Sequence, residues 1–132
     1  MKNLLSILFS LFFSVSVLAQ VTATSESFES CDYDAYNEDF VNCTSVDLNS
    51  TFVFDIEESE VRFYTDENAK TYLIEEFEID ENETMIFNLV DTEDDSNRFI
   101  LLFNEEEMLI MIIPEDINNQ QALKFYLSQL IY

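Results

Sequence analysis

Apolar residues recur at every second position through the middle of the chain. A period of two predicts β-strands, and short polar separators favour hairpins between neighbouring strands. Six runs show the pattern: TFVFDI (51–56), EVRFYT (60–65), KTYLIEEFEID (70–80), TMIFNLVD (84–91), RFILLF (98–103) and MLIMII (108–113). The pattern predicts a six-stranded antiparallel meander, curved or partly closed into a small barrel.

Run 70–80 changes its parity near the middle. Tyr72 and Ile74 share one face of a regular strand, whereas Phe77 and Ile79 fall on the other. A β-bulge near Glu75–Glu76 would bring all four onto one face.

The sequence contains no glycine, the residue that tight hairpin turns normally use. We therefore expect longer loops built on type I turns. The residues expected to adopt the left-handed backbone in them are Asn68, Asn82, Asn97 and Asn104.

The C-terminal run QQALKFYLSQLIY (120–132) has a different spacing. The spacing is helical, which predicts an amphipathic helix; the residues on its apolar face would be Leu123, Phe125 or Tyr126, Leu127, Leu130 and Ile131. Such a helix would cover the last two strands, which are apolar on both faces. A further strand is the alternative. Residues 51–132 are thus expected to form an α+β or mostly β fold, with the helix packed on the sheet.

The first 19 residues have the features of a secretory signal peptide. Lys2 precedes an apolar stretch of fifteen residues, and Val17 and Ala19 occupy the two small-residue positions before a cleavage site. A membrane anchor would need about 20 apolar residues, and Gln20 ends the run before that. We expect cleavage between Ala19 and Gln20, and a secreted or periplasmic protein.

Residues 20–50 form a polar N-terminal segment with the two cysteines, Cys31 and Cys43. In an exported chain this pair predicts a disulfide that closes a short loop. Between them, Tyr33, Tyr36 and Phe40 suit either a short helical turn or an irregular loop.

Cleavage would leave four basic and 28 acidic residues, a formal charge of −24 where the whole sequence carries −23. Nucleic acids and anionic membrane surfaces attract proteins through lysine and arginine, so neither is an expected partner. An unidentified protein or glycan is the expected partner, and the oligomeric state is left open.

The composition limits the available chemistry. Histidine is absent, which removes Ser-His-Asp and Cys-His machinery and the usual zinc sites. Without glycine there is no phosphate-binding loop or dinucleotide fingerprint. Paired carboxylates remain, but a small domain offers little room for a walled cleft. We expect a protein that is not an enzyme and has no cofactor, with Ca²⁺ as the one possible exception.

The acidic stretch DTEDDSN (91–97) is the candidate calcium site. It does not fit an EF-hand, because Ser96 and Leu102 stand where glycine and glutamate are required. Asp91, Asp94 and Asp95 could still supply oxygen ligands to a less regular site. The alternative is a solvated hairpin tip, and charge runs more commonly have that structure.

Aromatic residues at strand positions raise a second possibility. A curved sheet can enclose an apolar cavity that binds a ligand. The candidate lining residues are Phe52, Phe54, Phe63, Phe87, Phe99 and Phe103. The alternative is that these side chains fill a close-packed core.

A signal peptide ending in LAQ, followed by TFVFDIEESEVRFYT, KTYLIEEFEID, NRFILLFNEEE and LIMIIPED, resembles small exported proteins of flavobacteria and relatives. The resemblance covers residues 1–116. That group has no assigned activity, so the resemblance implies an exported protein and transfers no site residues.

Three functions follow from these patterns. The first is a non-enzymatic binding or structural module, which contacts its partner by strand addition at an exposed edge strand, TFVFDI. The second is a carrier of an apolar small ligand in a cavity between sheet and helix. The third is divalent-cation binding through the acidic hairpin loops.

Overall fold

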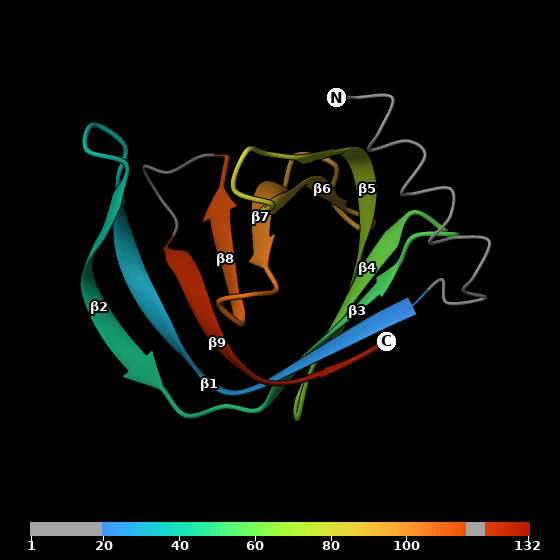
Figure 1. Cartoon of the computed structure of the whole chain (residues 1–132), viewed down its shortest axis with the longest axis horizontal. Helices are drawn as coiled ribbons and strands as arrows, with labels where there is room; N and C mark the ends of the chain where they lie inside the picture. Colours follow the sequence, from blue (N-terminus) through green and yellow to red (C-terminus); the bar gives the residue numbers. More distant parts are fainter. Residues whose placement is uncertain (1–19, 116–120) are drawn as a thin grey trace.

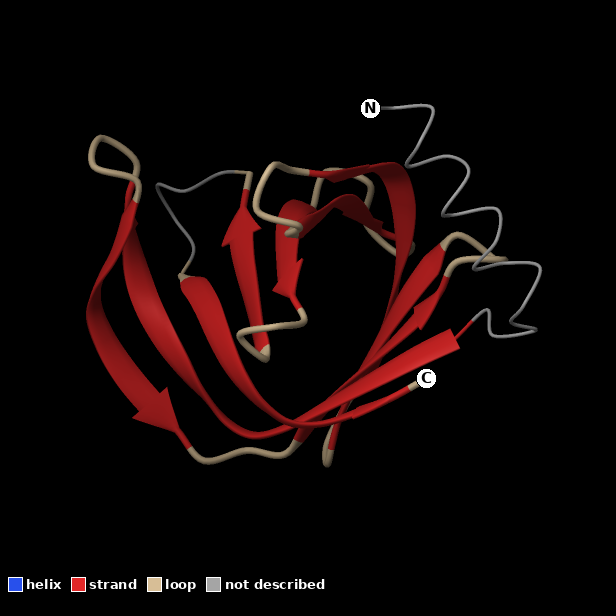
Figure 2. Cartoon of the chain, in the orientation of Figure 1, coloured by secondary structure: helices blue, strands red, loops and turns tan. Residues whose placement is uncertain are grey.

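A computed structural model describes residues 20–115 and 121–132; the predicted signal peptide, residues 1–19, lies outside them. The described residues form antiparallel β-strands and contain no helix (Figure 2). Accordingly, none of them belongs to a helix long and apolar enough to cross a membrane.

Nine strands follow one another along the described chain. They are β1 (Gln20–Asp34), β2 (Asp39–Val46), β3 (Ser50–Asp55), β4 (Glu60–Thr65), β5 (Ala69–Ile79), β6 (Met85–Asp91), β7 (Arg98–Asn104), β8 (Leu109–Pro114) and β9 (Ala122–Ile131). Each strand from β3 to β8 pairs with the next in sequence, which is the meander that the alternating pattern predicts.

The long strand β1 closes the sheet into a barrel. Its residues 20–25 pair with β3 along one edge, and residues 22–31 pair with β9 along the other. Eight strands, β1 and β3 to β9, therefore form a closed ring (Figure 1). Strand β2 lies outside this ring and pairs with residues 28–34 of β1. The partial closure expected from the sequence is thus a complete one.

All six sequence-predicted strands are present, as β3 to β8. The predicted bulge is confirmed, because the register between β5 and β6 shifts between Ile74 and Glu76. Tyr72, Ile74 and Phe77 consequently all pack against the core.

The predicted C-terminal helix is wrong, as is the total of six strands. Residues 122–131 form β9, which pairs with β8 and β1. Leu123, Phe125 and Leu127 alternate toward the core, as in any strand. Opposite Thr24–Ser25 of β1, however, β9 advances from Gln129 to Leu127 and leaves Ser128 as an extra residue. This bulge moves the next inward residue to Leu130, which creates the spacing that resembles a helix.

The N-terminal segment also differs from its prediction. VTATSESFES (21–30) is expected only as part of a polar segment, with no strand predicted there, yet it belongs to β1, with Ala23 and Ser25 fully buried. Strand β3 is consequently an internal strand between β1 and β4. TFVFDI is therefore not an exposed edge, and the strand-addition surface predicted there does not exist. The edge strand of the described sheet is β2.

The hairpin loops form without glycine, and the residues that adopt the left-handed backbone in them are not the predicted ones. The loops are longer than two residues, as expected, but none of the four proposed asparagines has a positive φ. In three loops the last residue before the next strand has a positive φ instead. These residues are Glu38, Ser59 and Met108.

In those same three loops a side-chain oxygen at the end of the preceding strand accepts a hydrogen bond from a loop N–H. The three pairs are Asp34 with Asn37, Asp55 with Glu58, and Asn104 with Glu107. Two acids, Asp34 and Asp55, thus have a structural role as turn caps.

The barrel interior is filled largely by phenylalanine. Phe52 and Phe125 meet edge to face with 4.9 Å between ring centroids, and Phe54 stacks on Phe103 at 5.0 Å. All four rings are almost completely buried. Aromatic contacts of this kind add about 0.5–1.5 kcal/mol per pair to the stabilisation from burial itself. The four rings fill the interior of the barrel between Phe125 and Phe54.

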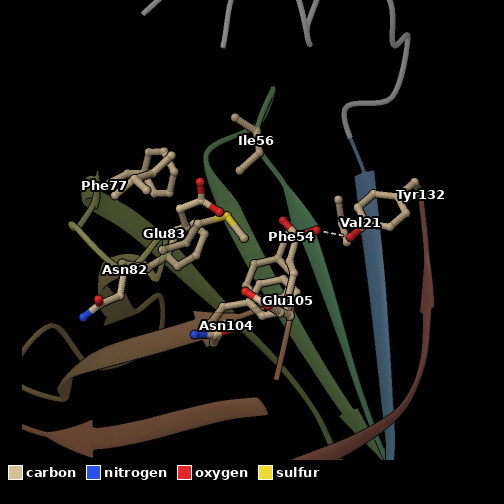
Figure 3. Close-up of a pocket in the computed structure, with 14 residues that line it drawn as sticks. Val21, Phe54, Ile56, Phe77, Asn82, Glu83, Asn104, Glu105 and Tyr132 are labelled. Atoms are coloured by element: carbon tan, nitrogen blue, oxygen red, sulfur yellow. Dashed lines mark hydrogen bonds between the residues drawn. The ribbon is translucent and has the colours of Figure 1, made fainter. Parts of the chain in front are cut away.

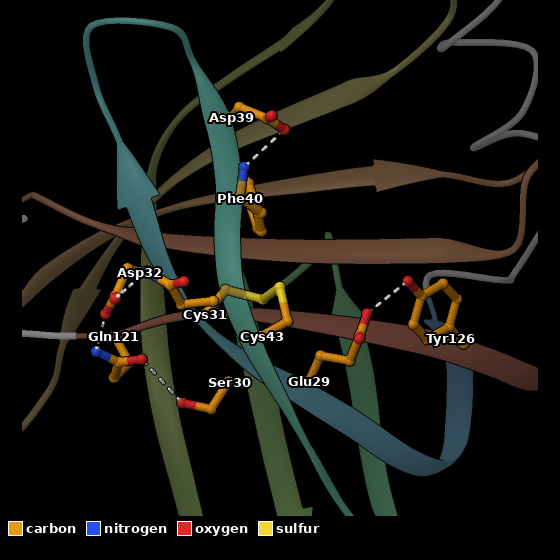
Figure 4. The surroundings of a disulfide bond; sticks show 10 residues. Glu29, Ser30, Cys31, Asp32, Asp39, Phe40, Cys43, Gln121 and Tyr126 are labelled. Atoms are coloured by element: carbon orange, nitrogen blue, oxygen red, sulfur yellow. Dashed lines mark hydrogen bonds between the residues drawn. A yellow bond between two sulfur atoms is a disulfide. The ribbon is translucent and has the colours of Figure 1, made fainter.

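The predicted disulfide is present. Cys31 of β1 and Cys43 of β2 are bonded across the hairpin, beside a bulge at which Asn42 has a φ of 53° (Figure 4). Side chains also link this part of β1 to β9 and to Gln121, the residue before it. Gln121 donates to Asp32 at 2.8 Å, and the Tyr126 hydroxyl donates to Glu29 at 2.6 Å.

Candidate functional site: a cavity at one end of the barrel

One end of the barrel is hollow. The start of β1, the ends of β3, β5, β7 and β9, and the start of β6 surround a cavity of about 460 Å³ (Figure 3). Its walls are mainly apolar: Val21, Phe54, Ile56, Phe77, Ile79, Met85, Phe87, Phe103 and Tyr132. The volume falls in the usual range for small-ligand sites, about 300–1,000 Å³.

The apolar walls follow from strand periodicity. Inward positions alternate along each strand, so Met85 and Phe87 of β6 both face the interior, with Ile79 and Phe77 as their partners on β5. Phe54 packs on Phe87 at 5.2 Å and on Phe103 at 5.0 Å, measured between ring centroids. These three buried rings form the floor and separate the cavity from the filled part of the barrel.

The mouth is polar and acidic. It is lined by Asn82, Glu83, Asn104, Glu105 and Glu106, which belong to the loops after β5 and β7 or to their ends. Every charged residue that lines the cavity is therefore a glutamate. In a chain with so large a negative charge, the field at this mouth attracts cations and repels anions.

Tyr132 crosses one side of the mouth. Its hydroxyl donates a hydrogen bond to the carboxylate of Glu105, the dashed line in Figure 3. Partial burial, followed by this hydrogen bond and the glutamate charge, raises the pKa of Tyr132 to about 12. The tyrosine is thus neutral and keeps its proton at physiological pH, and it links the end of β9 to the loop after β7.

The structure distributes the six predicted cavity residues over the whole barrel. Phe54, Phe87 and Phe103 line the cavity. Phe52 is a buried core residue below them, and Phe63 packs against that core. Phe99 lies against Tyr72, edge to face at 5.5 Å.

Sequence reasoning missed several wall residues, among them Val21, Ile56, Met85 and Tyr132. The parity of Met85 with Phe87 was a usable signal. Tyr132 carried none, because its place depends on β9 being a strand.

The predicted calcium ligands lie at the end of β6 and in the loop between β6 and β7, away from the cavity lining. Asp91 is almost completely buried, with a side-chain exposure of 2%, and accepts a hydrogen bond from Lys70 Nζ at 2.9 Å. It also accepts from the Glu93 N–H at 2.9 Å and from Asn97 Nδ2 at 3.2 Å. The bond from Lys70, then the one from Glu93, holds the pKa of Asp91 below its usual range.

The other two predicted ligands are exposed. Asp94 accepts hydrogen bonds from the backbone N–H and the hydroxyl of Ser96, which lower its pKa, and Asp95 is exposed beside it. Across the described residues, no group of three or more aspartate, glutamate or cysteine side chains is arranged to hold a metal ion. Calcium binding therefore stays a prediction.

Comparisons with known proteins add little to this geometry. No protein-family model matches the chain, and no curated protein matches it. Among solved structures, it is similar to the crystal structure of Treponema pallidum Tp0751 (Pallilysin), with 14% sequence identity and a TM-score of 0.43 over 76% of each chain. Similarity at this level carries no inference about function.

Proposed function

We propose that the protein is an exported β-barrel that binds a small apolar ligand in the cavity at its open end. The observation that carries the proposal is the cavity itself, about 460 Å³ in volume and walled by aliphatic and aromatic side chains. Apolar surface that a ligand can cover gives a favourable burial free energy. The Cys31–Cys43 disulfide supports an extracytoplasmic location, where such bonds persist.

The mouth narrows the class of ligand. A ligand whose apolar part fills the cavity would place its polar end beside Glu83, Glu105 and Glu106. A carboxylate there would meet three carboxylates and lose its hydration, whereas a neutral or cationic group would not. We therefore propose a ligand with an apolar body and a neutral or cationic polar end, and not a fatty acid.

The proposed activity is binding without chemistry. The sequence has no histidine, and the charged groups at the cavity are the mouth glutamates. Glu105 is already engaged by the Tyr132 hydroxyl. The walls thus offer a shaped apolar surface, which suits storage or transport of a ligand.

A fluorescence titration tests the proposal. The neutral probe N-phenylnaphthylamine becomes bright in apolar surroundings, and anilinonaphthalene sulfonate has the same ring system with an added negative charge. The wild-type protein should bind the neutral probe saturably and at one site, with an affinity at least about tenfold higher than for the sulfonate.

Two variants locate the binding. Ile79→Trp places an indole in the cavity wall, and Leu73→Trp places one on the same strand at a residue that is 44% exposed. Ile79→Trp should raise the dissociation constant of the neutral probe by about tenfold or more, and Leu73→Trp should leave it unchanged. Equal thermal unfolding of both variants is the folding control. Equal probe affinity in both variants, or a preference for the sulfonate, would contradict the proposal.

A further inference from the structure

A hydrogen bond between two strand ends lies at the mouth of the cavity. Tyr132 follows the last residue of β9, and its hydroxyl donates to the carboxylate of Glu105, the first residue after β7 (Figure 3). Both residues line the cavity. The bond is therefore placed where the polar end of a ligand in the cavity would meet the protein.

Each of these two residues continues the inward side of its strand. Glu105 lies two positions after Phe103, one of the buried floor rings, and Tyr132 lies two positions after Leu130, which packs against the core. Two residues of extended chain span about 7 Å. An apolar chain that rests on the floor rings can thus end beside the Glu105 carboxylate.

The basic residues of the described chain are engaged away from this carboxylate. Four basic residues follow the predicted signal peptide, and none of them lines the cavity. The ammonium of Lys124 lies 5.5 Å from the centre of the Tyr126 ring, and the other three bases are in ion pairs. These pairs are Arg62–Asp55, Lys70–Asp91 and Arg98–Glu75. The donor that Glu105 receives is instead the neutral hydroxyl of Tyr132.

The Tyr132 hydroxyl is a donor that a ligand can replace. The residue is 53% exposed, so water can hydrate the hydroxyl once it is released. An ammonium group in its place would form a charge-assisted hydrogen bond with Glu105, about twice as strong as a bond between neutral groups. Glu83 and Glu106, which also line the mouth, add to the attraction for a cation. The exchange therefore favours a cationic ligand over a neutral one of the same shape.

We propose that the ligand is an amphiphilic amine, whose apolar body fills the cavity and whose ammonium group displaces the Tyr132 hydroxyl and donates to Glu105. The inference rests on the proposed function and narrows its ligand class from neutral or cationic to cationic. It assigns Glu105 as the specificity-determining residue and Tyr132 as the competitor for its carboxylate.

Titration calorimetry of the mature protein compares three ligands with the same apolar chain: octylamine, octanol and octanoate. The titrations use about 0.15 M salt, which screens the general attraction of a strongly acidic protein for cations. Octylamine should bind about tenfold more tightly than octanol, because only the amine gains the contact with Glu105. Octanoate should bind more weakly than octanol, since the mouth repels its charge.

Two glutamate variants locate the recognition of charge. Glu105→Gln should weaken octylamine binding about fivefold and leave octanol binding unchanged, because the amide keeps the shape of the side chain and loses its charge. Glu107→Gln is the matched control. It removes the same charge from the same loop, at an exposed residue outside the cavity lining, and should leave both affinities unchanged.

Tyr132→Phe tests the exchange itself. Loss of the competing hydroxyl should strengthen octylamine binding about threefold and leave octanol binding unchanged. A purely structural role of Tyr132 would instead change the affinities for both ligands equally. Thermal unfolding of each variant reports whether the barrel is intact.

The outcomes separate this inference from the proposed function. Octanol binding as tight as octylamine binding, an octylamine affinity insensitive to Glu105→Gln, or weaker octylamine binding in Tyr132→Phe would overturn the inference and leave an apolar binding cavity in place. If none of the three ligands binds, the proposed function is contradicted and the inference falls with it.

Discussion

The ion pair between Asp91 and Lys70 offers the sharpest test of the packing. Asp91 ends β6 with 2% of its side chain exposed, and it accepts hydrogen bonds from Lys70, from the Glu93 N–H and from Asn97. The substitution Asp91→Asn keeps the shape of the side chain and removes its charge. Asp95→Asn removes the same charge from an exposed position of the same loop, and is the matched control.

The expected loss is about 2 kcal/mol in the free energy of unfolding. A hydrogen bond to a charged group contributes about 1.5–3 kcal/mol, and breaking a fully buried pair costs about 3–5 kcal/mol. The Lys70 side chain is 44% exposed, so water can hydrate its ammonium in the variant, and the lower end applies. For a domain of this size, about 2 kcal/mol corresponds to a fall of about 8 °C in Tm. The Asp95→Asn control should change stability by less than about 0.5 kcal/mol.

The pH dependence gives an independent check. The pKa of Asp91 in the folded protein is lowered from an ordinary value of 3.8, chiefly by the hydrogen bond from Lys70. Its stabilisation is therefore complete above that value and is lost as the pH falls through the lowered folded pKa. Urea unfolding from about pH 7 to about pH 2 should show a gap between wild type and Asp91→Asn that is constant at first and shrinks below about pH 4. A variant as stable as wild type at neutral pH, or a gap unchanged in acid, would refute the reasoning.

Three further predictions concern other parts of the molecule. Replacing Cys31 and Cys43 together by alanine should lower stability by about 3 kcal/mol in urea unfolding, because the open loop has more freedom in the unfolded chain. Calcium chloride and sodium chloride at matched ionic strength should raise Tm equally, because Lys70 already binds the Asp91 carboxylate and the Ser96 hydroxyl already binds that of Asp94. An additional, saturable rise in Tm with calcium would establish a metal site. Because the pKa of Tyr132 is raised from 10.0 to about 12, its contribution to stability should decline as pH rises above 10, and the loss should be smaller in Tyr132→Phe.

The strands from β3 to β8 were predictable because apolar residues recur in each at every second position. Inward residues such as Phe52 and Phe54 follow this period, and short acidic loops separate the strands. Even the irregularity in β5 was visible, since Ile74 and Phe77 can share a face only through a bulge.

The two strands that close the barrel were not predictable in the same way. In β1 the inward positions include Ala23 and Ser25, which pair with Phe52 and Ser50 on β3 and leave room for larger side chains. A strand that is buried because its neighbours are large gives no hydrophobic signal of its own. In β9 the extra residue Ser128 interrupts the two-residue period of inward side chains, so that the spacing of the apolar residues resembles that of a helix.

The sequence could indicate a cavity, but not where in the barrel it lies. Six phenylalanines were candidates, but whether Phe54 or Phe99 lines the cavity depends on where along the barrel the cavity lies. That is a property of the closed ring, to which β1 and β9 contribute Val21 and Tyr132.

The central claim is that the open end of the barrel binds an apolar ligand. The most direct measurement is a series of amide nuclear magnetic resonance spectra of the mature protein during titration with N-phenylnaphthylamine. Amide signals of the wall residues Ile56, Ile79 and Tyr132 should shift and saturate together, while those of Tyr72 and Phe99, which pack on each other outside the cavity lining, should stay in place. Shifts confined to residues outside the cavity lining, or an unchanged spectrum at saturating probe, would contradict it.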